Sequence, residues 1–459
     1  MAQQYEIFQK MLPALLNEKK YTSLRDIMAN MNPSDVAGVF SDLEEDRIPL
    51  LFRLLPKELA SDVFVEMEPD AQEVLIKGFS DKELKDLIDE LYVDDAADLV
   101  EEMPANVVNR ILKQADPEMR ASINQILRYP ENSAGSIMTI EYISLQKNMT
   151  VGESIQQIRC QGVDKETIYT CYVTDARKLI GLVSVKDLLL AQDDALIESI
   201  METNIISVNT LTDQEEVARM FSKYNFMAMP VVDGENRMVG IVTFDDAMDV
   251  MQDEATEDIE IMAAITPSEE TYIKSSPFEL FKHRIPWLML LMISATFTGI
   301  IITKFEDALS KVVILTSFIP MLMDTGGNSG SQSSVTVIRA LSLGELNFAD
   351  IGRVIWKEVR AAVLCGISLG IACFGKIMLV DRLLLSNPEV TATVALVVCL
   401  AMCVTVLIAK IVGCCLPMIA KKLGFDPAVM ASPFITTIVD ALSLLIYFAF
   451  ATGLLLKGL

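Results

Sequence analysis

A single carboxylate interrupts a long apolar stretch near the end of the chain. Asp440 is the only acidic or basic residue between Pro427 and Leu456, in a stretch longer than the about 20 residues that cross a bilayer. A carboxylate at the centre of such a span costs roughly 2.5–3.5 kcal/mol on insertion scales, so a functional role is expected. The alternative is an Asp that pairs with a polar neighbour on another helix and holds a bundle together.

A second apolar run, residues 312–338, contains a segment rich in glycine. The segment at 320–332 reads PMLMDTGGNSGSQ. Pro320 lacks an amide donor, and Gly326, Gly327 and Gly330 favour non-helical backbone. The sequence therefore predicts a helix that is kinked or broken inside the membrane. The alternative is that the glycines mark a close contact between helices.

The same segment carries oxygen ligands. Carbonyls freed by a broken helix, together with Asp324, Asn328 and Gln332, would line a cavity with oxygen atoms. Such a lining suits hard cations. The 8 cysteines show neither a disulfide framework nor zinc-type spacing, and His283 is the only histidine, so soft-metal ligation is not expected.

Charge divides the chain into two unlike parts. Residues 1–276 hold 52 acidic and 24 basic side chains, whereas residues 277–459 hold 11 and 14. An acidic N-terminal part attracts cations and repels nucleic acid, so no nucleic-acid partner is expected. The first residues show neither a basic nor an apolar signal region, which predicts that this part stays in the cytosol.

Five apolar runs after residue 276 predict five membrane-spanning helices. With a cytosolic N-terminus, eight basic residues flank the runs on the inside and five on the outside, in line with the positive-inside tendency. An odd number of crossings places the C-terminus outside the cell membrane. The runs are Ile285–Thr303, Val312–Leu341, Val359–Val380, Ala392–Ile419 and Ala428–Leu456.

The cytosolic part combines two patterns. Residues 1–132 contain short amphipathic helical units separated by turn residues, which predicts a stacked, superhelical domain. Residues 133–199 and 200–252 alternate strands with helices and repeat each other at a spacing of about 60 residues. The sequence therefore predicts an internal duplication.

Each repeat resembles a CBS domain and ends in a Gly-x-x-Ser/Thr-x-x-Asp pattern, at 181–187 and 240–246. In CBS pairs this pattern often contacts the ribose of an adenine nucleotide such as ATP. Ser184, Asp187 and Thr243 are therefore the candidate nucleotide-binding residues. The alternative is a regulatory scaffold that binds no nucleotide.

An acidic connector, residues 253–276, joins the second repeat to the first apolar run. Asp246, Asp249, Asp253 and Glu257 fall along one helical face. Like charges so aligned repel unless a cation lies between them. A solvated acidic helix is the simpler alternative, but the position beside the membrane favours a gate.

Taken together, these features resemble the MgtE family of magnesium channels and transporters over nearly the whole chain. The specific elements are the glycine segment and the context TTIVDALSLLIY around Asp440. The resemblance implies an all-α N-terminal superhelical domain, an α/β CBS-domain pair, a plug helix at 253–276, and an α-helical transmembrane domain of five helices at 277–459. It also implies a homodimer with the pore on the two-fold axis, where two Asp440 carboxylates balance one divalent cation.

The resemblance also implies roles for individual residues. Pore or ion-binding positions are Asp440, Asn328, Gln332, Gly326, Gly327, Ser432 and Thr436. Regulatory Mg²⁺ is expected at acids of the N-domain (Asp62, Asp94, Asp98), the CBS pair (Asp213, Glu215, Asp246), the plug (Glu254, Glu257, Asp258) and the mouth of the last helix (Asp426). Departures from the family pattern are Asn225 in place of an acid, Ser432 in place of Asn and Ser443 in place of Gly.

The sequence therefore predicts a passive Mg²⁺ channel or transporter, not an enzyme, that cytosolic Mg²⁺ closes. Nothing in it resembles a Walker lysine or the phosphorylation site of an ATP-driven pump. The alternative function is a membrane-anchored CBS sensor of adenine nucleotides that regulates a partner protein.

Overall fold

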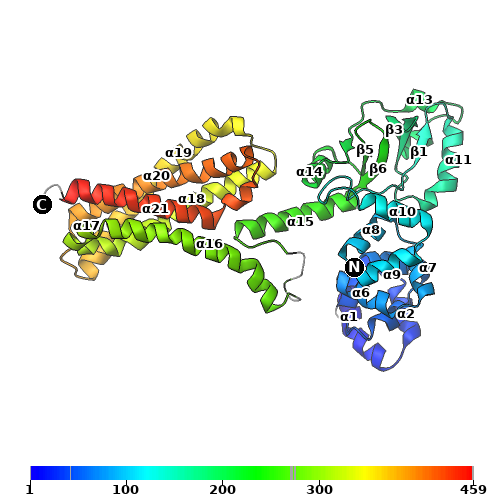
Figure 1. Cartoon of the computed structure of the whole chain (residues 1–459), viewed down its shortest axis with the longest axis horizontal. Helices are drawn as coiled ribbons and strands as arrows, with labels where there is room; N and C mark the ends of the chain where they lie inside the picture. The colour runs from blue at the N-terminus through cyan, green and yellow to red at the C-terminus, as the bar shows by residue number, and fades with distance from the viewer. Residues whose placement is uncertain (1, 42, 269–271, 273–274, 457–459) are drawn as a thin grey trace. The chain divides into compact units, whose positions relative to one another are not determined.

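The computed structural model describes residues 2–41, 43–268, 272 and 275–456. The chain divides into two compact units, Met1–Met251 and Gln252–Leu459. The first unit contains short helices and two small sheets, and the second contains long helices (Figure 1).

Short helices separated by turns build the N-terminal part of the first unit. Turn residues cap them, as where Ser80 accepts a hydrogen bond from the Glu83 amide at the start of α7. Their apolar faces share one core, in which the Phe52 ring lies 6.2 Å from Phe40 and 6.3 Å from Phe64. This confirms the predicted all-α N-terminal domain. The helices described here are α1 (Ala2–Asn17), α2 (Tyr21–Met28), α3 (Pro33–Ser41), α4 (Ile48–Phe52), α5 (Lys57–Val65), α6 (Pro69–Gly78), α7 (Asp81–Ile88), α8 (Val93–Glu102), α9 (Ala105–Gln114) and α10 (Pro117–Ile126).

Two three-stranded sheets, one for each repeat, confirm the predicted CBS pair. In each sheet the first strand runs parallel to the second, and the second runs antiparallel to the third. The strands are β1 (Ser144–Gln146), β2 (Thr170–Asp175), β3 (Lys178–Ser184), β4 (Val208–Asn209), β5 (Ala228–Val232) and β6 (Met238–Thr243). The accompanying helices are α11 (Val151–Gln161), α12 (Val185–Leu190), α13 (Ile197–Ile200), α14 (Gln214–Tyr224) and α15 (Phe244–Met262).

The segment that leads into each repeat lies on the sheet of the other repeat. A β-bridge joins each leading segment to the third strand of the opposite sheet. Glycine makes both approaches possible, since a Cβ on Gly181 would lie 2.6 Å from the Met201 sulfur and one on Gly240 would lie 2.7 Å from the Met138 sulfur. The duplicated Ile-Met pairs and the glycines of the repeated motif are therefore parts of one packing arrangement.

The second unit is a helical bundle in which α20 contacts α18, α19 and α21. Its long helices are α16 (Pro277–Lys304), α18 (Ile319–Ser342), α19 (Ile351–Lys376), α20 (Ala392–Lys422) and α21 (Ser432–Ala451). Shorter elements are α17 (Glu306–Lys311), η2 (Val313–Phe318), η3 (Phe348–Asp350), η4 (Ile377–Leu384), η5 (Pro427–Met430) and η6 (Thr452–Leu456).

Among the described residues, four stretches are long and apolar enough to cross a membrane. They are Pro277–Lys304, Phe348–Leu384, Ala392–Lys422 and Pro427–Leu455. The remaining long helix, α18, falls outside this group because glycine, serine and threonine dilute its apolar residues. The fifth crossing therefore stays a prediction.

The predicted break in the glycine segment is wrong. α18 is continuous from Ile319 to Ser342, and the irregular turns of η2 come before it. Pro320 occupies the first turn of the helix, where a missing amide removes no hydrogen bond. No carbonyls are freed in the middle of this helix to line a cavity.

The glycines instead allow close contact between helices, as the alternative proposed. A Cβ on Gly326 would lie 2.7 Å from the Ser443 hydroxyl oxygen of α21. A Cβ on Gly413 of α20 would collide with the carbonyl oxygen of Gly330. Small residues therefore bring the backbones of α18, α20 and α21 together.

Replacing Gly413 by Ala should push α20 away from α18. We expect Gly413→Ala to lower the free energy of unfolding by about 1–3 kcal/mol, the usual cost of overpacking, measured by thermal unfolding in detergent. Gly375→Ala is the control, because a Cβ there meets nothing within 4 Å and alanine favours a helix by up to about 1 kcal/mol. Equal effects of the two substitutions would contradict the close contact.

Candidate functional site

A cleft of about 450 Å³ opens between α18 and α21. Asp324 and Asn328 of α18 line it together with Thr436 and Asp440 of α21. The remaining lining residues are Ile319, Pro320, Met323 and Gly327, so no basic side chain belongs to the lining. The cleft thus presents two carboxylates, one amide and one hydroxyl.

Helical spacing explains why these side chains share one space. Asp324 and Asn328 are four residues apart on α18, as Thr436 and Asp440 are on α21, so each pair lies on one helix face. Gly327 lies between the two pairs, where a Cβ would come within 2.9 Å of the Thr436 methyl carbon. The glycine therefore sets the short distance between the two lining faces.

The cleft includes some of the predicted pore residues and leaves others out. Asp440, Thr436, Asn328 and Gly327 lie in it. Gln332 is exposed and does not line the cleft. The other two predicted positions are Gly326, which is buried at the contact with Ser443, and Ser432, whose side chain lies outside the described part of the structure.

The cleft supplies few ligands for a metal ion from one chain. Over the described residues, no group of three or more Asp, Glu, His or Cys side chains is arranged to hold a metal. Mg²⁺ gives up its waters reluctantly and is commonly bound through one or two carboxylates. The chemistry of the cleft therefore fits a cation that keeps part of its hydration shell.

A second group of acids lies in the first unit, where α8 faces the CBS pair. We call it the acidic junction. The charges of its neighbouring members all raise the pKa of Asp94. Its members are Asp94, Asp95 and Asp98 of α8, Glu141 and Glu166 of the first repeat, and Asp246 of α15.

Asp94 is the most deeply placed acid of the junction. Its side chain is buried, and its Oδ1 has no hydrogen-bond partner within the described residues. Loss of water raises the pKa of Asp94 well above its usual range, and the Asp246 charge raises it further. A buried carboxylate oxygen without a donor suits a cation that arrives from solution.

Burial raises the pKa values of three further junction acids on α8 and in the first repeat, and of Asp246. Loss of water, followed by the Asp246 charge, raises the pKa of both Asp95 and Asp98 to about 7, although the Asp98 side chain stays open to solvent on one side. Loss of water and the Asp95 charge raise the pKa of Glu166 to about 8. Burial raises the pKa of Asp246 to about 6, with the hydrogen bond from the Thr243 hydroxyl acting against it.

Sequence reasoning missed three members of the junction. Glu141 accepts hydrogen bonds from the Val93 amide at 3.0 Å and the Thr139 hydroxyl at 3.4 Å, which places an anion at the start of α8. Asp95 is adjacent to a predicted site residue and could have been found. Glu141 and Glu166 carry no local signal, because only the fold brings them to α8.

Other predicted regulatory acids have structural roles here. Asp213 caps α14 by accepting the Glu215 amide at 2.9 Å, and Glu215 pairs with Arg219 at 3.2 Å. Asn225 ends α14 in the left-handed conformation with φ of 56°, which Asn tolerates better than most residues. Asp62 is exposed on α5. Metal binding at these positions stays a prediction.

The predicted acids of the plug lie in the second unit. The Ser342 hydroxyl donates to Asp258 at 3.1 Å, while burial raises the pKa of Asp258. Burial and then the charges of Glu254 and Asp426 raise the pKa of Glu257. Four predicted acids therefore gather at one place, with Ile261 and Met262 of α15 packed on Ile338, Ala428 and Ala431 beside them.

The repeated CBS motif forms a helix cap in both repeats. Ser184 donates to Asp187 at 2.5 Å and accepts the Asp187 amide at 3.1 Å at the start of α12. Thr243 and Asp246 form the same bond at the start of α15. Thr243 is buried, whereas Asp187 is exposed. Nucleotide binding by these residues stays a prediction.

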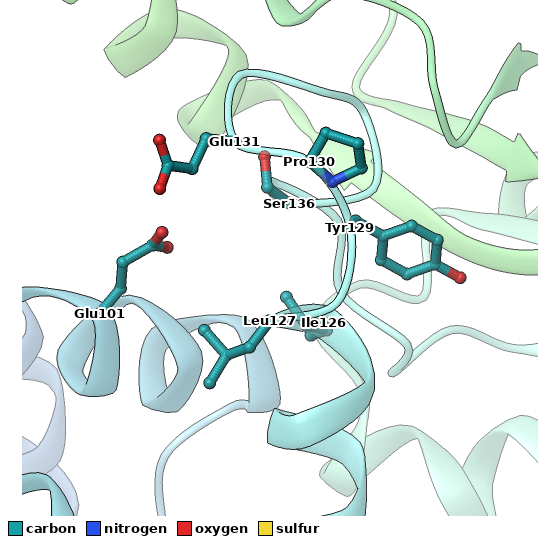
Figure 2. Close-up of a pocket in the computed structure, with 7 residues that line it drawn as sticks. All are labelled: Glu101, Ile126, Leu127, Tyr129, Pro130, Glu131 and Ser136. Carbon is teal, nitrogen blue, oxygen red and sulfur yellow. The ribbon is translucent and has the colours of Figure 1, made fainter.

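A second cavity, of about 300 Å³, lies in the first unit beside the end of α10 (Figure 2). Glu101 and Glu131 carry their carboxylates on the same side of it, and Leu127 and Tyr129 add apolar surface. No predicted site residue lines it. Two exposed acids do not define a ligand, so we assign this cavity no function.

Apolar helices long enough to cross a membrane, joined to a CBS pair and an acidic helical domain, define the class of multi-pass membrane proteins that carry additional folded domains. Family models match in the same order: the MgtE intracellular N domain at 31–132, CBS domains at 134–194 and 197–253, and MgtE, described as a divalent cation transporter, at 319–450. The chain belongs to the MgtE family.

Curated relatives support this over the full length. The magnesium transporter MgtE of Thermus thermophilus is 35% identical over 449 residues, covering 97% of this chain and 98% of the relative. The magnesium transporter MgtE of Bacillus subtilis is 34% identical over 444 residues, covering 96% and 95%.

Solved structures resemble the cytosolic part. A crystal structure of the cytosolic domain of the Mg²⁺ channel MgtE in complex with ATP is 36% identical, with a TM-score of 0.50 over 53% of this chain and 99% of that one. The soluble part of a magnesium transporter is 30% identical, with a TM-score of 0.51 over 55% and 99%.

The raised pKa values predict that the acidic junction weakens as pH rises. Below about pH 4 the carboxyls are protonated in both folded and unfolded chains. Between that pH and their folded pKa values of about 6 to 8, the folded state holds more protons, so stability falls as pH rises through this range. We expect hydrogen-exchange protection of α8 in the full chain, without divalent ions, to fall by about 1–2 kcal/mol from pH 5 to pH 8.5 after correction for intrinsic rates.

Asp94→Asn with Asp98→Asn should flatten this slope. Asp194→Asn, an exposed acid outside the junction, is the control and should leave the slope unchanged. Protection of α8 that increases with pH would contradict the assignment.

Proposed function

We propose that the protein is a passive magnesium channel or transporter and that the α18–α21 cleft is its cation site. The observation that carries this proposal is the meeting of Asp440 and Asp324 with Asn328 and Thr436, with no basic residue in the lining. Oxygen ligands of this kind suit a hard divalent cation. The names of the full-length relatives support Mg²⁺ as that cation.

A homodimer completes the cation site in this proposal. Asp324, Asn328 and Gln332 are exposed at intervals of four residues along α18, a polar stripe on a membrane helix. Such a stripe is costly against lipid, and a second copy across a two-fold axis would cover it and double the carboxylates. Gln332 then acts at the interface of the two copies. Gly326 supports the site through packing, and Ser432 is proposed as a pore residue on the family resemblance.

In this proposal the domain boundaries are those predicted from the sequence. Residues 1–132 are the N-domain, 133–199 and 200–252 the CBS domains, 253–276 the plug and 277–459 the transmembrane domain. The N-terminal part is cytosolic, the C-terminus lies outside, and the chain contacts lipid but no nucleic acid. In this proposal the protein transports down the electrochemical gradient and is not an enzyme, since nothing in the sequence resembles a Walker lysine or the phosphorylation site of a pump.

An adenine nucleotide is the proposed ligand of the CBS pair. A relative's cytosolic domain was solved with ATP, and exposed Asp187 and half-buried Ser184 are the candidates for contact with a ribose. Thr243 is buried and already bonded to Asp246, so it is the weakest of the three candidates. A CBS sensor without transport would leave the polar cleft unexplained, and the relatives do not favour it.

Asp440→Ala should abolish Mg²⁺ uptake into proteoliposomes, because it removes one of the two cleft carboxylates from each chain. Flux should fall to that of protein-free liposomes while the chain keeps its assembly state and melting temperature. Glu389→Gln, an exposed acid outside the cleft lining, should keep full flux. Flux at the wild-type rate through Asp440→Ala would reject the cleft as the cation site.

The acidic junction and the plug acids are the proposed sensors of cytosolic Mg²⁺. In the arrangement described, the junction acids repel one another without forming a metal cluster. A bound cation would neutralise them and favour an arrangement in which they lie closer. Closure then follows only if Mg²⁺ binds the closed state more tightly than the open one.

Replacing Asp94, Asp98, Asp246 and Glu257 by Ala should give transport that high internal Mg²⁺ no longer inhibits. Neutralisation also relieves repulsion, which by itself favours compaction, so the sign of the change shows which effect is larger. Flux is measured with Mg²⁺ varied on the cytosolic side. A variant that is permanently closed, or inhibited as the wild type is, would show that metal bridging at these acids is not the gate.

A further inference from the structure

An ion pair between a buried lysine and a half-buried glutamate lies among α18, α19 and α20. The Lys410 ammonium donates to the Ser333 hydroxyl oxygen at 3.2 Å, and the Ser333 hydroxyl donates to the Glu358 carboxylate at 2.7 Å. Lys410 Nζ and Glu358 Oε2 are 3.9 Å apart. Lys410 is 6% exposed and Ser333 2%. None of the three lines the cleft, and sequence reasoning missed Lys410 although it interrupts the apolar run 392–419.

Both charges lie well inside their helices. Lys410 comes 12 residues before the end of α20, and Glu358 comes seven residues after the start of α19. At 1.5 Å per residue these positions are about 18 and 10 Å from the helix ends. Lys410 lies inside the predicted membrane run 392–419, whereas Glu358 comes directly before the run 359–380. An ionisable group inside a membrane helix, as Lys410 is, is costly and marks a functional position.

Stability alone is a weak reason for keeping this pair. Apolar residues of similar volume often replace a buried ion pair without loss of stability. The middle of the face that α18 turns to its neighbours is made of small residues, among them Gly326, Ser329, Gly330 and Ser333. Small side chains permit close contact between helices, but they interlock little, so they do not prevent α18 from sliding or rotating against its neighbours. A directional hydrogen bond supplies the missing constraint.

The pair holds the side of α18 that is opposite the cleft. Ser333 comes nine residues after Asp324, which is two and a half turns at about 3.6 residues per turn. Asp324 therefore faces the cleft while Ser333 faces Lys410 and Glu358. Rotation of α18 that breaks the Ser333 bonds also moves Asp324 and Asn328 relative to Asp440.

We propose that Lys410, Glu358 and Ser333 form a polar latch that fixes the rotation of α18 and thereby determines which divalent cation the cleft accepts. These are positioning residues, since they act through Asp324 and Asn328 and touch no ion. The proposal rests on the proposed transport function. It adds the physical source of discrimination between cations of similar charge, because selection among oxygen-bound divalent ions depends on cavity size and ligand placement.

The test compares fluxes of Mg²⁺, Mn²⁺, Co²⁺ and Ca²⁺ into proteoliposomes for the full-length chain. Glu358→Leu with Lys410→Met removes both charges at similar volume, and the exchange Glu358→Lys with Lys410→Glu keeps the pair reversed. Ser333→Ala removes only the bridge. The control is Arg353→Met with Asp350→Asn, an ion pair 3.2 Å long at the start of α19 whose arginine is 89% exposed.

We expect the apolar double variant to melt near the wild-type temperature while its Mg²⁺-to-Ca²⁺ flux ratio falls by about threefold or more, at the lower end of couplings between contacting residues. Ser333→Ala should shift the ratio in the same direction, the exchanged pair should restore part of it, and the control pair should leave it unchanged. An apolar double variant that keeps the wild-type ratio overturns the latch. If that variant fails to fold, Ser333→Ala decides, and an unchanged ratio overturns the proposal.

Failure of the proposed function is a separate outcome. A wild-type chain that carries none of these cations rejects the transport proposal itself, together with the selectivity that the latch is said to set. The physical contact is then judged by a double-mutant cycle in thermal unfolding of Lys410→Met and Glu358→Leu. Additive effects in that cycle show that the pair is uncoupled and remove the latch as well.

Discussion

Repulsion between neighbouring carboxylates is the constraint that the cleft and the acidic junction share. Elsewhere the chain pairs its acids, as in the surface bridges of Lys57 with Glu90 and Arg53 with Glu83. The described lining of the cleft holds acids but no lysine or arginine. At the acidic junction the charges of neighbouring acids raise the pKa of Asp94, while the Lys165 charge lowers that of Glu141. Burial strengthens repulsion between such groups. A mobile cation or a proton is then the available counter-charge, which makes both places responsive to solution conditions.

The cleft depends on how closely α18 can approach its neighbours. Glycines at the contacts with α20 and α21 remove the side chains that would hold the helices apart. Because glycine has no side chain, α18 has few apolar side chains that interlock with α20 and α21. Hydrogen bonds must therefore fix the position of α18 along and around its axis. Ser334 donates to the Met430 carbonyl at 2.7 Å and Ser333 to Glu358 at 2.7 Å, which anchors two adjacent residues to two different elements. Close approach and precise register are therefore supplied by different residues of one helix.

The sequence was informative wherever a residue stood out against its own surroundings. Asp440 is solitary in an apolar span, and Asn328 and Thr436 lie within a few residues of such anomalies. The predicted break in this helix is wrong because glycine's backbone propensity does not account for packing: a Cβ on Gly326 would collide with Ser443, a residue more than a hundred positions away. Glu141 and Glu166 come close to α8 only in the folded chain, where Glu141 accepts the Val93 amide, 48 positions away in the sequence. Lys410 was within reach, since it breaks an apolar run just as Asp440 does.

Protons and divalent cations compete for the same carboxylates at the acidic junction. Folded pKa values of about 6 to 8 mean that protons occupy part of these sites near neutral pH. A bound cation must displace those protons, so its apparent affinity rises with pH. Protons and Mg²⁺ both reduce the repulsion, but only an ion that coordinates several carboxylates favours one arrangement of them over another. Since α15 begins at the junction cap of Thr243 and Asp246 and ends at Met262, which packs on the second unit's own residues, any such preference acts on an element shared with the membrane part. α15 thus carries both Asp246 of the acidic junction and the plug acids Glu254, Glu257 and Asp258. In the proposed mechanism, a cation bound at these acids affects transport only to the extent that it distinguishes the two states.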